Sequence, residues 1–415
     1  MAGTRSIAAC RLCAATDLQE IIDFGEVPLG NNLQETSSAA RAAARYPLDL
    51  HRCAECGHFQ LGHAVAPEAL YATNYTYLSG IGPSFIKHFD GYANWVVATC
   101  GLPKDALVVD VGSNDGTCLK AFRARGFRVC GVDPAALPAK IANEDGIDTI
   151  NAFFDPDAVG RIKAKYGAAD FVTSHNVLAH VDDLAATFAN IHALLKPDGL
   201  FCFEVGYFKE VLTNNFFDTI YHEHLDYHHA SPLVRHLTAL GFAIEDIGVN
   251  PVQGGSIRVL CRKSVTGAVS ASAQAFVAAE QGSILNDGVY LKNWRHEIEA
   301  RMGQFRVMLH DRARQRRSIA GFGAPTKATL LMQMADIGRD DIAYVAEDNA
   351  LKAGRFLPGT GVPIVLTSHL LSNPPDVLVI FAWNFADDII GKIRGRLGKP
   401  VEVIIPLPEA KSVQL

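Results

Sequence analysis

One stretch, residues 106–133, constrains the fold most strongly. It reads ALVVDVGSNDGTCLKAFRARGFRVCGVD: an apolar run, a glycine-bearing loop, an amphipathic segment ending at a glycine, and a second apolar run. This order predicts strand, loop, helix and strand, which is the first half of a doubly wound parallel α/β sheet. Such sheets bind ligands at the carboxyl ends of their strands, so we expect the loop and the end of the second strand to face a ligand.

The loop has the chemistry of a cofactor cradle. Its spacing is Asp-x-Gly-x-x-x-Gly, which differs from the G-x-G-x-x-G of pyrophosphate binders. Glycine lets the backbone approach a ligand or turn sharply into a helix, and a carboxylate at the second strand end offers two oxygens to the hydroxyls of a ribose. The predicted cofactor-binding residues, including polar groups of the loop and of a later strand end, are Asp110, Gly112, Asn114, Asp115, Gly116, Asp133 and Asn176.

Two CxxC pairs lie in the first 70 residues, Cys10 with Cys13 and Cys53 with Cys56. Each pair directs two thiolates to one point, and two pairs complete a tetrahedral four-sulfur zinc site. Such a site has no open position, so the predicted zinc is structural. A redox role remains an alternative, although neither pair opens a helix after a buried strand as a thioredoxin-like motif does.

The segments after residue 133 continue the same fold. IHALLKPDGLFCFEVG (191–206) reads as a helix, a Pro-Asp-Gly turn and a buried strand, and LTALGFAIEDIGV with GGSIRVLCRK supplies a helix and a closing hairpin. With the glycine loop and the ribose carboxylate, LLKPDG makes this part resemble the class I S-adenosylmethionine-dependent methyltransferases. The resemblance implies S-adenosylmethionine as cofactor and S-adenosylhomocysteine as product. A different nucleotide-binding sheet is the alternative.

Residues 216–229, FFDTIYHEHLDYHH, follow the fifth strand, in an insertion over the strand ends where this fold binds its substrate. A methyl donor methylates carbon only when that carbon is nucleophilic, most simply as an enolate beside a ketone. This chemistry needs a base for the α-proton and a donor for the developing oxyanion, roles that histidine and tyrosine can fill. A metal site is the alternative, because His224 and His228 stand at i and i+4, although HExxH is absent.

The motifs CxxC…CxxC, VGSNDG, NVLAHV and IYHEHLDYH occur in this order. They make the chain resemble the three-domain sugar C-methyltransferases of deoxysugar biosynthesis from Cys10 to about Pro408. The resemblance implies a zinc domain (1–70), a methyltransferase domain (71–265), and a helical linker with a C-terminal Rossmann-like domain (266–415). It also implies a nucleotide-linked ketosugar as substrate, methylated at C3 of a 4-keto deoxyhexose. An O- or N-methyltransferase of a small metabolite, or a binding module with a decayed core, remains open.

The same resemblance assigns roles to four catalytic residues. His224 would be the general base, and Tyr221 would bind the sugar and steady the enolate. Glu223 would orient His224 or bind a sugar hydroxyl, and His180 would be a second polar group near the keto oxygen.

The substrate contacts implied by the resemblance come from two regions. NYTYLSG (74–80) matches a segment that enters the active site, although Leu78, Gly80 and Gly82 stand where the family usually has serine. SIAGFGAPTKATLLM (318–332) begins a second Rossmann-like unit, whose helix start suits a diphosphate. NAD is an alternative ligand there, but the loop lacks a third glycine. The predicted substrate-binding residues are Tyr75, Tyr77, Ser79, Thr326, Lys327, Trp383 and Asn384; equally, Lys327 would be an exposed helix residue and Trp383 a domain-interface anchor.

Charge and composition exclude some partners. The formal net charge of −6 gives no electrostatic footprint for nucleic acid or an anionic membrane. The N-terminus lacks the apolar core of a signal peptide, and no stretch is long enough to span a bilayer. We therefore expect a cytoplasmic protein without nucleic-acid or membrane partners, whose nine cysteines are thiols or metal ligands rather than disulfides.

Overall fold

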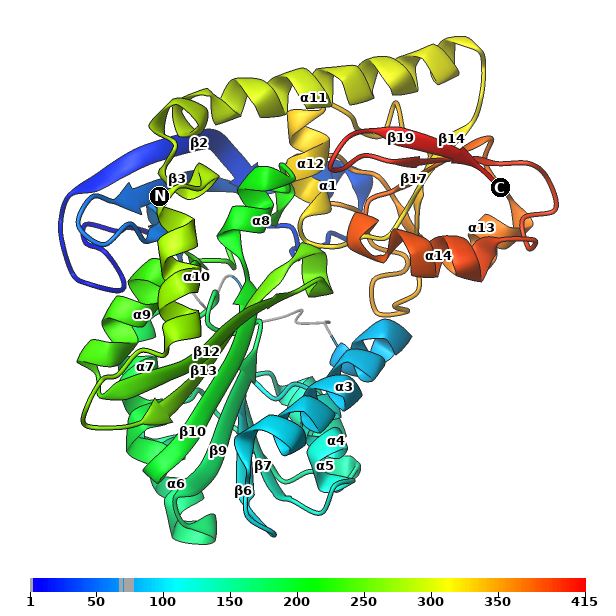
Figure 1. Ribbon diagram of the computed structural model, residues 1–415. Helices are drawn as coiled ribbons and strands as arrows, with labels where there is room; N and C mark the ends of the chain where they lie inside the picture. Colours follow the sequence, from blue (N-terminus) through cyan, green and yellow to red (C-terminus); the bar gives the residue numbers. More distant parts are fainter. Residues whose placement is uncertain (1–2, 67–69, 71–77) are drawn as a thin grey trace.

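The computed structural model describes residues 3–66, 70 and 78–415. Within these residues the strands form four sheets of two, four, six and seven strands. Helices lie on both faces of the seven-stranded sheet, and a second α/β unit follows it in the chain (Figure 1). The predicted α/β class, with a doubly wound core between a small N-terminal domain and a C-terminal Rossmann-like domain, is confirmed.

The N-terminal domain is built on antiparallel strands. Its elements are β1 (Thr4–Ser6), β2 (Leu18–Pro28), α1 (Ser37–Arg41), β3 (Arg45–Cys53), β4 (Phe59–Leu61) and β5 (His63–Val65). The four-stranded sheet has the order β11-β4-β3-β2, and its outer strand β11 (Asp226–Tyr227) comes from the histidine-rich run. Asp226 pairs with Gln60, and Tyr227 pairs with Phe59. The run is therefore hydrogen-bonded into the N-terminal domain.

The seven-stranded sheet forms the middle of the molecule, in the order β12-β13-β10-β9-β6-β7-β8. Strand β6 (Leu107–Val111), between β9 and β7, is buried at all five positions because neighbouring strands and helices enclose it. The other elements are η1 (Ser79–Ile81), α3 (Pro83–Cys100), α4 (Thr117–Arg123), β7 (Arg128–Asp133), α5 (Ala136–Glu144), β8 (Thr149–Asn151), α6 (Pro156–Tyr166), β9 (Ala169–His175), α7 (Leu184–Leu194), β10 (Leu195–Gly206), α8 (Phe208–Thr213), η2 (Phe217–Thr219), α9 (Ala230–Ala239), β12 (Phe242–Asn250), η3 (Val252–Gly254) and β13 (Ser256–Lys263).

The sheet confirms the predicted strand order around the glycine loop. Strands β6, β7, β8, β9 and β10 run parallel, and β13 pairs antiparallel with both β10 and β12, as a closing hairpin does. The predicted Pro-Asp-Gly turn differs in detail, because it lies inside β10 as a register shift between Leu195 and Leu200. Asp198 has a φ of 59° there, so the turn interrupts the strand locally without ending it.

The C-terminal part begins with helices and ends in a six-stranded sheet of order β16-β15-β14-β17-β18-β19, parallel except for the last strand. Its elements are α10 (Ala271–Gln281), η4 (Ile284–Asn286), α11 (Gly288–Arg314), β14 (Ile319–Phe322), α12 (Ala328–Met334), β15 (Val345–Glu347), β16 (Ile364–Leu366), α13 (Thr367–Ser372), β17 (Val377–Ile380), η5 (Trp383–Phe385), α14 (Ala386–Ile393), β18 (Glu402–Ile405) and β19 (Lys411–Gln414). The long helix α11 buries residues at spacings of three and four, as an amphipathic helix does: Leu291, Trp294, Ile298, Met302, Phe305 and Leu309.

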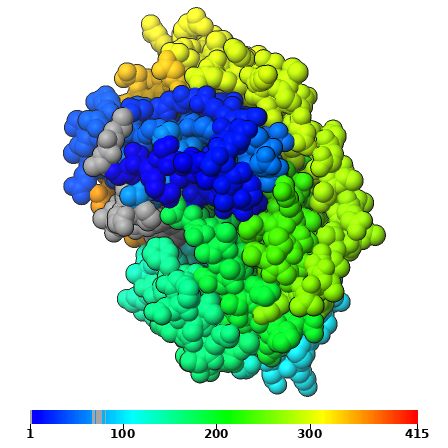
Figure 2. Space-filling model, turned by 90° about the vertical axis from the view of Figure 1, so that its left-hand side faces the viewer, coloured from blue at the N-terminus to red at the C-terminus, as the bar shows by residue number. Residues whose placement is uncertain are grey.

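The N-terminal and C-terminal domains share one hydrophobic core. Ile22 and Phe24 of β2, Trp294 of α11 and Leu331 of α12 belong to the same buried cluster. Figure 2 shows the N-terminal residues in blue, above the green methyltransferase core and beside the yellow helices. No helix among residues 3–66, 70 and 78–415 is long and apolar enough to cross a membrane.

Helix α3 is fixed to the sheet by a buried carboxylate. Glu204 on β10, 3 % exposed, contacts His88 of α3 at 2.5 Å, His175 at 3.2 Å and Arg258 at 2.5 Å. Burial alone raises the pKa of Glu204, but the hydrogen bonds with His175 and His88 outweigh it and hold the pKa below its usual range. The ionised form of Glu204 therefore stabilises the fold.

Replacing Glu204 with alanine is expected to destabilise the protein by about 3–5 kcal/mol at neutral pH, because it leaves the Arg258 guanidinium without its anion and the buried His175 without its hydrogen-bond partner. A group with a depressed folded pKa contributes stability above its unfolded pKa of about 4.3 and loses that contribution as the pH falls through the folded value. The difference between wild type and variant should thus shrink below about pH 4. Thermal melting at several pH values measures this. The matched control is Glu245→Ala, which removes a half-exposed ion pair with Arg262 and should change stability by about 1 kcal/mol or less.

Candidate active site

The glycine loop at the end of β6 forms a tight cradle. Gly112 and Gly116 have φ values of 74° and 75°, in the left-handed region that favours glycine. A Cβ atom on Gly112 would lie 2.2 Å from a methyl group of Val177. The loop therefore needs glycine at these positions both for its conformation and for its packing against the segment after β9.

Asp133 lies beside this loop at the end of β7. One of its carboxylate oxygens accepts the backbone N–H of Asn114 at 2.8 Å, and the other accepts that of Ala135 at 2.8 Å. Burial raises the pKa of Asp133 against these hydrogen bonds. Each oxygen has a second lone pair, so the residue can still accept two ribose hydroxyls. Asp110, 3 % exposed, lies near the end of the neighbouring strand β6, and burial raises its pKa well above the usual range. A carboxylate in the position of Asp133, able to accept ribose hydroxyls, fits a nucleoside cofactor.

Asn114 and Asp115 bind a different partner within the chain. The backbone N–H of Ser79 donates to the Asn114 side chain at 2.9 Å, and that of Gly80 donates to Asp115 at 2.8 Å. The structure thus fixes the start of η1 onto the cofactor loop, and direct contact of these two side chains with a cofactor stays a prediction. Tyr75 and Tyr77, predicted in the preceding segment, lie outside the described residues.

Asn176 and Phe153 follow two strands of the same sheet, β9 and β8, which are separated by β6 and β7. Asn176 follows β9 with a left-handed φ of 56°, and its N–H donates to the carbonyl of Glu204. Phe153 follows β8, one residue after Ala152, whose N–H donates to the carbonyl of Asp133. Phe153 is 62 % exposed, which is unusual for a large aromatic residue and suits contact with a flat ligand ring. Phe153 is not among the site residues predicted from the sequence, although an aromatic residue directly after a strand end could have indicated it.

The histidine-rich run brings Tyr221, His224 and His180 together. The Tyr221 hydroxyl lies 2.7 Å from Nε2 of His224, and Nδ1 of His224 lies 3.0 Å from the carbonyl of Thr219. A carbonyl only accepts, so Nδ1 carries the proton and Nε2 has the free lone pair to which Tyr221 donates. The His180 ring packs edge-on at 4.6 Å from the His224 ring, centroid to centroid.

The electrostatics favour a neutral imidazole at this position. Burial, with the nearby His180, lowers the pKa of His224 well below its usual range. Burial likewise lowers the pKa of His180 to about 4. At neutral pH both rings are uncharged, so Nε2 of His224 can accept a proton.

This trio lies next to the cofactor cradle. His180 N donates to the carbonyl of Val177, the residue that packs on Gly112. Leu225, adjacent to His224, donates its N–H to the carbonyl of Ala179 at 2.6 Å. The base candidate and the glycine loop are therefore linked through the single turn after β9.

Glu223 binds the N-terminal domain. Both of its oxygens accept from the Asn31 side chain, at 2.9 and 3.1 Å. Burial raises the pKa of Glu223 to about 7, against the effects of Asn31 and of Lys352 from the C-terminal domain. All three domains thus meet at this carboxyl group. Asn31 was missed because nothing in its local sequence identifies a partner 192 positions away.

Two other histidines of the run have hydrogen-bond partners of their own. His222 contacts the carbonyl of Tyr46, and His229 contacts Glu280 and the carbonyl of Gly57. Both nitrogens of His224 are engaged. Among the described residues, the groups that could hold a metal ion do not include His224 with His228, so that alternative has no support in the structure.

The predicted substrate-binding residues of the C-terminal domain lie beside the first residues of the histidine-rich run (216–229). Lys327 donates to Asn384 at 2.7 Å and lies 3.6 Å from the ring centroid of Trp383. Trp383 stacks on Phe216 at 4.1 Å and donates its indole N–H to Asp218 at 2.7 Å. Burial lowers the pKa of Lys327 to about 8. Trp383 thus packs at the domain interface, and substrate contacts by Lys327, Trp383 and Asn384 stay predictions.

The nearby loops of the C-terminal domain are occupied by internal contacts. Gly30 of the N-terminal domain packs on the backbone of Thr326 so closely that a Cβ would lie 2.3 Å from the carbonyl oxygen. Glu347, at the strand end where a dinucleotide fold places its ribose-binding acid, accepts the N–H groups of Ala324, Asp348 and Asn349.

The four N-terminal cysteines form one cluster. Sγ of Cys10 lies 3.6 Å from that of Cys56, and Sγ of Cys13 lies 3.6 Å from that of Cys53. All four sulfurs lie within 4.8 Å of one another. A tetrahedral site with Zn–S bonds of about 2.3 Å needs sulfurs about 3.8 Å apart. The donor set and its spacing fit a structural zinc ion, as the sequence predicts.

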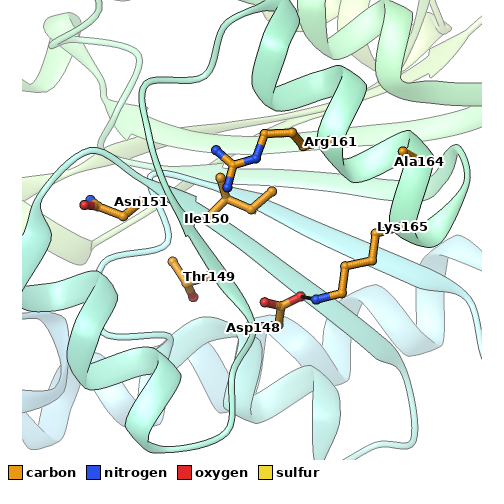
Figure 3. A pocket seen from close by; sticks show the side chains of 7 residues that line it. All are labelled: Asp148, Thr149, Ile150, Asn151, Arg161, Ala164 and Lys165. Atoms are coloured by element: carbon orange, nitrogen blue, oxygen red, sulfur yellow. Dashed lines mark hydrogen bonds and ion pairs between the residues drawn. The ribbon is translucent and has the colours of Figure 1, made fainter.

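A shallow groove of about 480 Å³ lies apart from these residues, at the edge strand β8 and helix α6 (Figure 3). The lysine of this groove forms an ion pair, since Nζ of Lys165 lies 2.6 Å from a carboxylate oxygen of Asp148. None of the predicted site residues lines it; its lining is Asp148, Thr149, Ile150, Asn151, Arg161, Ala164 and Lys165.

Comparisons with known proteins cover nearly the whole chain. Three family models match: "C-methyltransferase C-terminal domain" at 251–408, "Methyltransferase domain" at 88–247 and "Putative zinc binding domain" at 10–71. The C-methyltransferase NovU of Streptomyces niveus is 33% identical over 411 residues, 99% of this chain and 97% of that protein. A ubiquinone biosynthesis O-methyltransferase of Haemophilus ducreyi is 30% identical over 99 residues, 22% of this chain and 42% of that protein.

Similarity to solved structures is confined to part of the chain. Magnesium protoporphyrin IX methyltransferase from Synechocystis PCC 6803, solved with bound SAM, is 17% identical and covers 43% of this chain and 79% of its own. Its TM-score of 0.33 is too low to bear on function.

Proposed function

This chain belongs to the S-adenosylmethionine-dependent C-methyltransferase family, and we propose that it methylates a nucleotide-linked ketosugar at a carbon next to the ketone. The observation that carries the proposal is the neutral His224, whose unprotonated Nε2 accepts from the Tyr221 hydroxyl, next to the turn that packs on the glycine loop. Methylation of oxygen needs no carbon acid to be deprotonated, whereas methylation of an α-carbon does. A buried, uncharged imidazole beside a tyrosine hydroxyl suits the second reaction.

The proposed reaction starts at the C–H bond beside the ketone. The Tyr221 hydroxyl, which donates to Nε2 of His224 in the structure, first turns to the ketone oxygen. Nε2 of His224 then takes the proton, and the electron pair of the broken bond is delocalised into the enolate. The Tyr221 hydroxyl and His180 stabilise the oxygen of that enolate. Bound S-adenosylmethionine supplies an electrophilic methyl group, and the enolate carbon is the nucleophile that accepts it. The methylated carbon is most simply C3 of a 4-keto deoxyhexose, because that position is α to the ketone.

Lys327, Asn384 and Thr326 are proposed to hold the nucleotide part of the substrate. Lys327 is a cation in a largely buried setting, and it stands beside the run that carries His224. A diphosphate would match that charge. Ser79 is proposed to contact the sugar, since η1 is fixed to the cofactor loop.

The direct test is incubation with a labelled methyl donor and thymidine-, cytidine- and guanosine-linked ketosugars. The proposal expects label in one of these sugars, with the NMR signal of a methyl group on carbon. An O-methyl or N-methyl product would contradict it, as would transfer to an unrelated metabolite with none to any ketosugar.

Replacing Tyr221 with phenylalanine is expected to lower kcat by about 10²-fold, the usual cost of losing one oxyanion donor. The ring and its packing on His224 remain, so KM and cofactor affinity should change little. Steady-state kinetics measure the effect. The matched control is Tyr344→Phe, which removes a hydroxyl that donates to Asn373 far along the C-terminal domain and should leave kcat unchanged.

A further inference from the structure

Arg11 stands between two of the zinc-ligand cysteines, yet its side chain points away from the cluster and is only 4 % exposed. A buried guanidinium is retained only where its donors are paired. The sequence offers no reason for this burial, because a CxxC knuckle requires only its cysteines.

The guanidinium joins two segments of the active site. Nη2 donates to the carbonyls of Val181, at 2.9 Å, and of Asp182, at 2.5 Å. Nε donates to a carboxylate oxygen of Asp226 at 3.2 Å. Val181 directly follows His180, and Asp226 lies two residues after His224. Arg11 therefore holds the turn that carries His180 against the loop that carries His224.

The surroundings fix both ends of this link. Asp226 is 1 % exposed, and its other oxygen lies 2.8 Å from Nε2 of His58. The backbone N–H of Arg11 donates to the Gln60 side chain at 2.8 Å. Cys10 and Cys13 anchor the backbone on either side of Arg11 through the four-sulfur cluster. Further contacts therefore hold both the backbone of Arg11 and the groups that its guanidinium binds.

We propose that Arg11 is a positioning residue, through which the zinc knuckle sets the distance and orientation between His180 and His224. The residue acts on the two imidazoles through the segments that carry them. This assignment rests on the proposed roles of His224 and His180. It explains why a domain that holds a closed zinc site is joined to a methyltransferase.

The test compares Arg11→Ala and Arg11→Lys in the full-length protein. We expect both variants to keep zinc, measured by atomic emission, and to bind S-adenosylhomocysteine as the wild type does, measured by calorimetry. In Arg11→Ala, kcat should fall about 100-fold with little change in KM, because small displacements of reacting groups cost about that much. Millimolar guanidinium chloride should restore part of kcat to Arg11→Ala, with sodium chloride as the ionic-strength control.

A second readout does not depend on the substrate. In ¹⁵N-histidine NMR spectra, the ring signals of His180 and His224 should shift in both Arg11 variants. The matched control is Arg235→Ala: Arg235 donates to the carbonyl of Glu55 in the second knuckle but does not reach the active-site segments. It should leave these signals and kcat unchanged.

The outcomes separate the inference from the proposed function. Unshifted histidine signals in Arg11→Ala overturn the positioning role, whatever the substrate is. Loss of zinc or of S-adenosylhomocysteine binding in both Arg11 variants, without rescue by guanidinium, assigns Arg11 to general structure and also overturns it. Shifted signals in a protein that methylates no ketosugar support the positioning role and reject the substrate class.

Discussion

Replacing His224 with alanine is expected to lower kcat by about 10²- to 10⁴-fold, the range for a lost general base. The substitution removes the Nε2 lone pair to which Tyr221 donates and leaves the cofactor loop intact. Affinity for S-adenosylmethionine should therefore stay within about twofold of the wild type, since only the proton-transfer step is affected. Single-turnover kinetics and calorimetry measure the two quantities separately.

The matched control for His224 is His222→Gln. His222 belongs to the same run, but its ring contacts the carbonyl of Tyr46 rather than Tyr221. This variant tests whether a change anywhere in the run is damaging, and it should retain most of kcat. A His224→Ala enzyme with a near-normal rate would remove His224 from the role of base.

Loss of the zinc site is the second large effect. Small zinc domains gain about 10–16 kcal/mol of apparent free energy from their metal at neutral pH, so metal loss unfolds them. We expect Cys53→Ser to lose zinc and to melt at a much lower temperature, with rapid proteolysis of the first 65 residues. Because β11 is a strand of the N-terminal sheet, the loop that carries His224 should lose order with it. Metal analysis, melting curves and limited proteolysis report these changes.

Cys100→Ser is the control for the zinc prediction. Cys100 is partly buried at the end of α3 and lies outside the cysteine cluster. Its replacement should leave metal content and melting temperature nearly unchanged. A Cys53→Ser protein that lacks zinc but melts and resists protease as the wild type does would show that the metal does not support the fold.

Local sequence patterns predicted the strands and the glycine loop of the proposed cofactor site. The apolar runs around 107–111 and 128–133 became buried parallel strands, and the glycines between them have the left-handed φ values that a tight loop needs. The two CxxC pairs came together as expected because each knuckle is a local structure. These features depend on residues within one turn or one strand of each other.

Long-range partners could not be predicted in the same way. Glu223 bonds to Asn31, and Asp226 pairs with Gln60, across more than 160 positions of sequence. The tautomer of His224 depends on a backbone carbonyl, which no side-chain pattern records. Asn114 also binds the chain at Ser79, because a buried backbone N–H must find an acceptor. Each of these interactions depends on how the segments of the folded chain pack together.

The most direct test of the central claim is hydrogen exchange at the carbon beside the ketone. The enzyme is held in deuterium oxide with a nucleotide-linked 4-ketosugar and S-adenosylhomocysteine, so that no methyl group is available. Mass spectrometry should find deuterium at the α-carbon with the wild type and far less with His224→Ala. Equal exchange in the two proteins, or methylation by a wild type that exchanges nothing, would contradict the account.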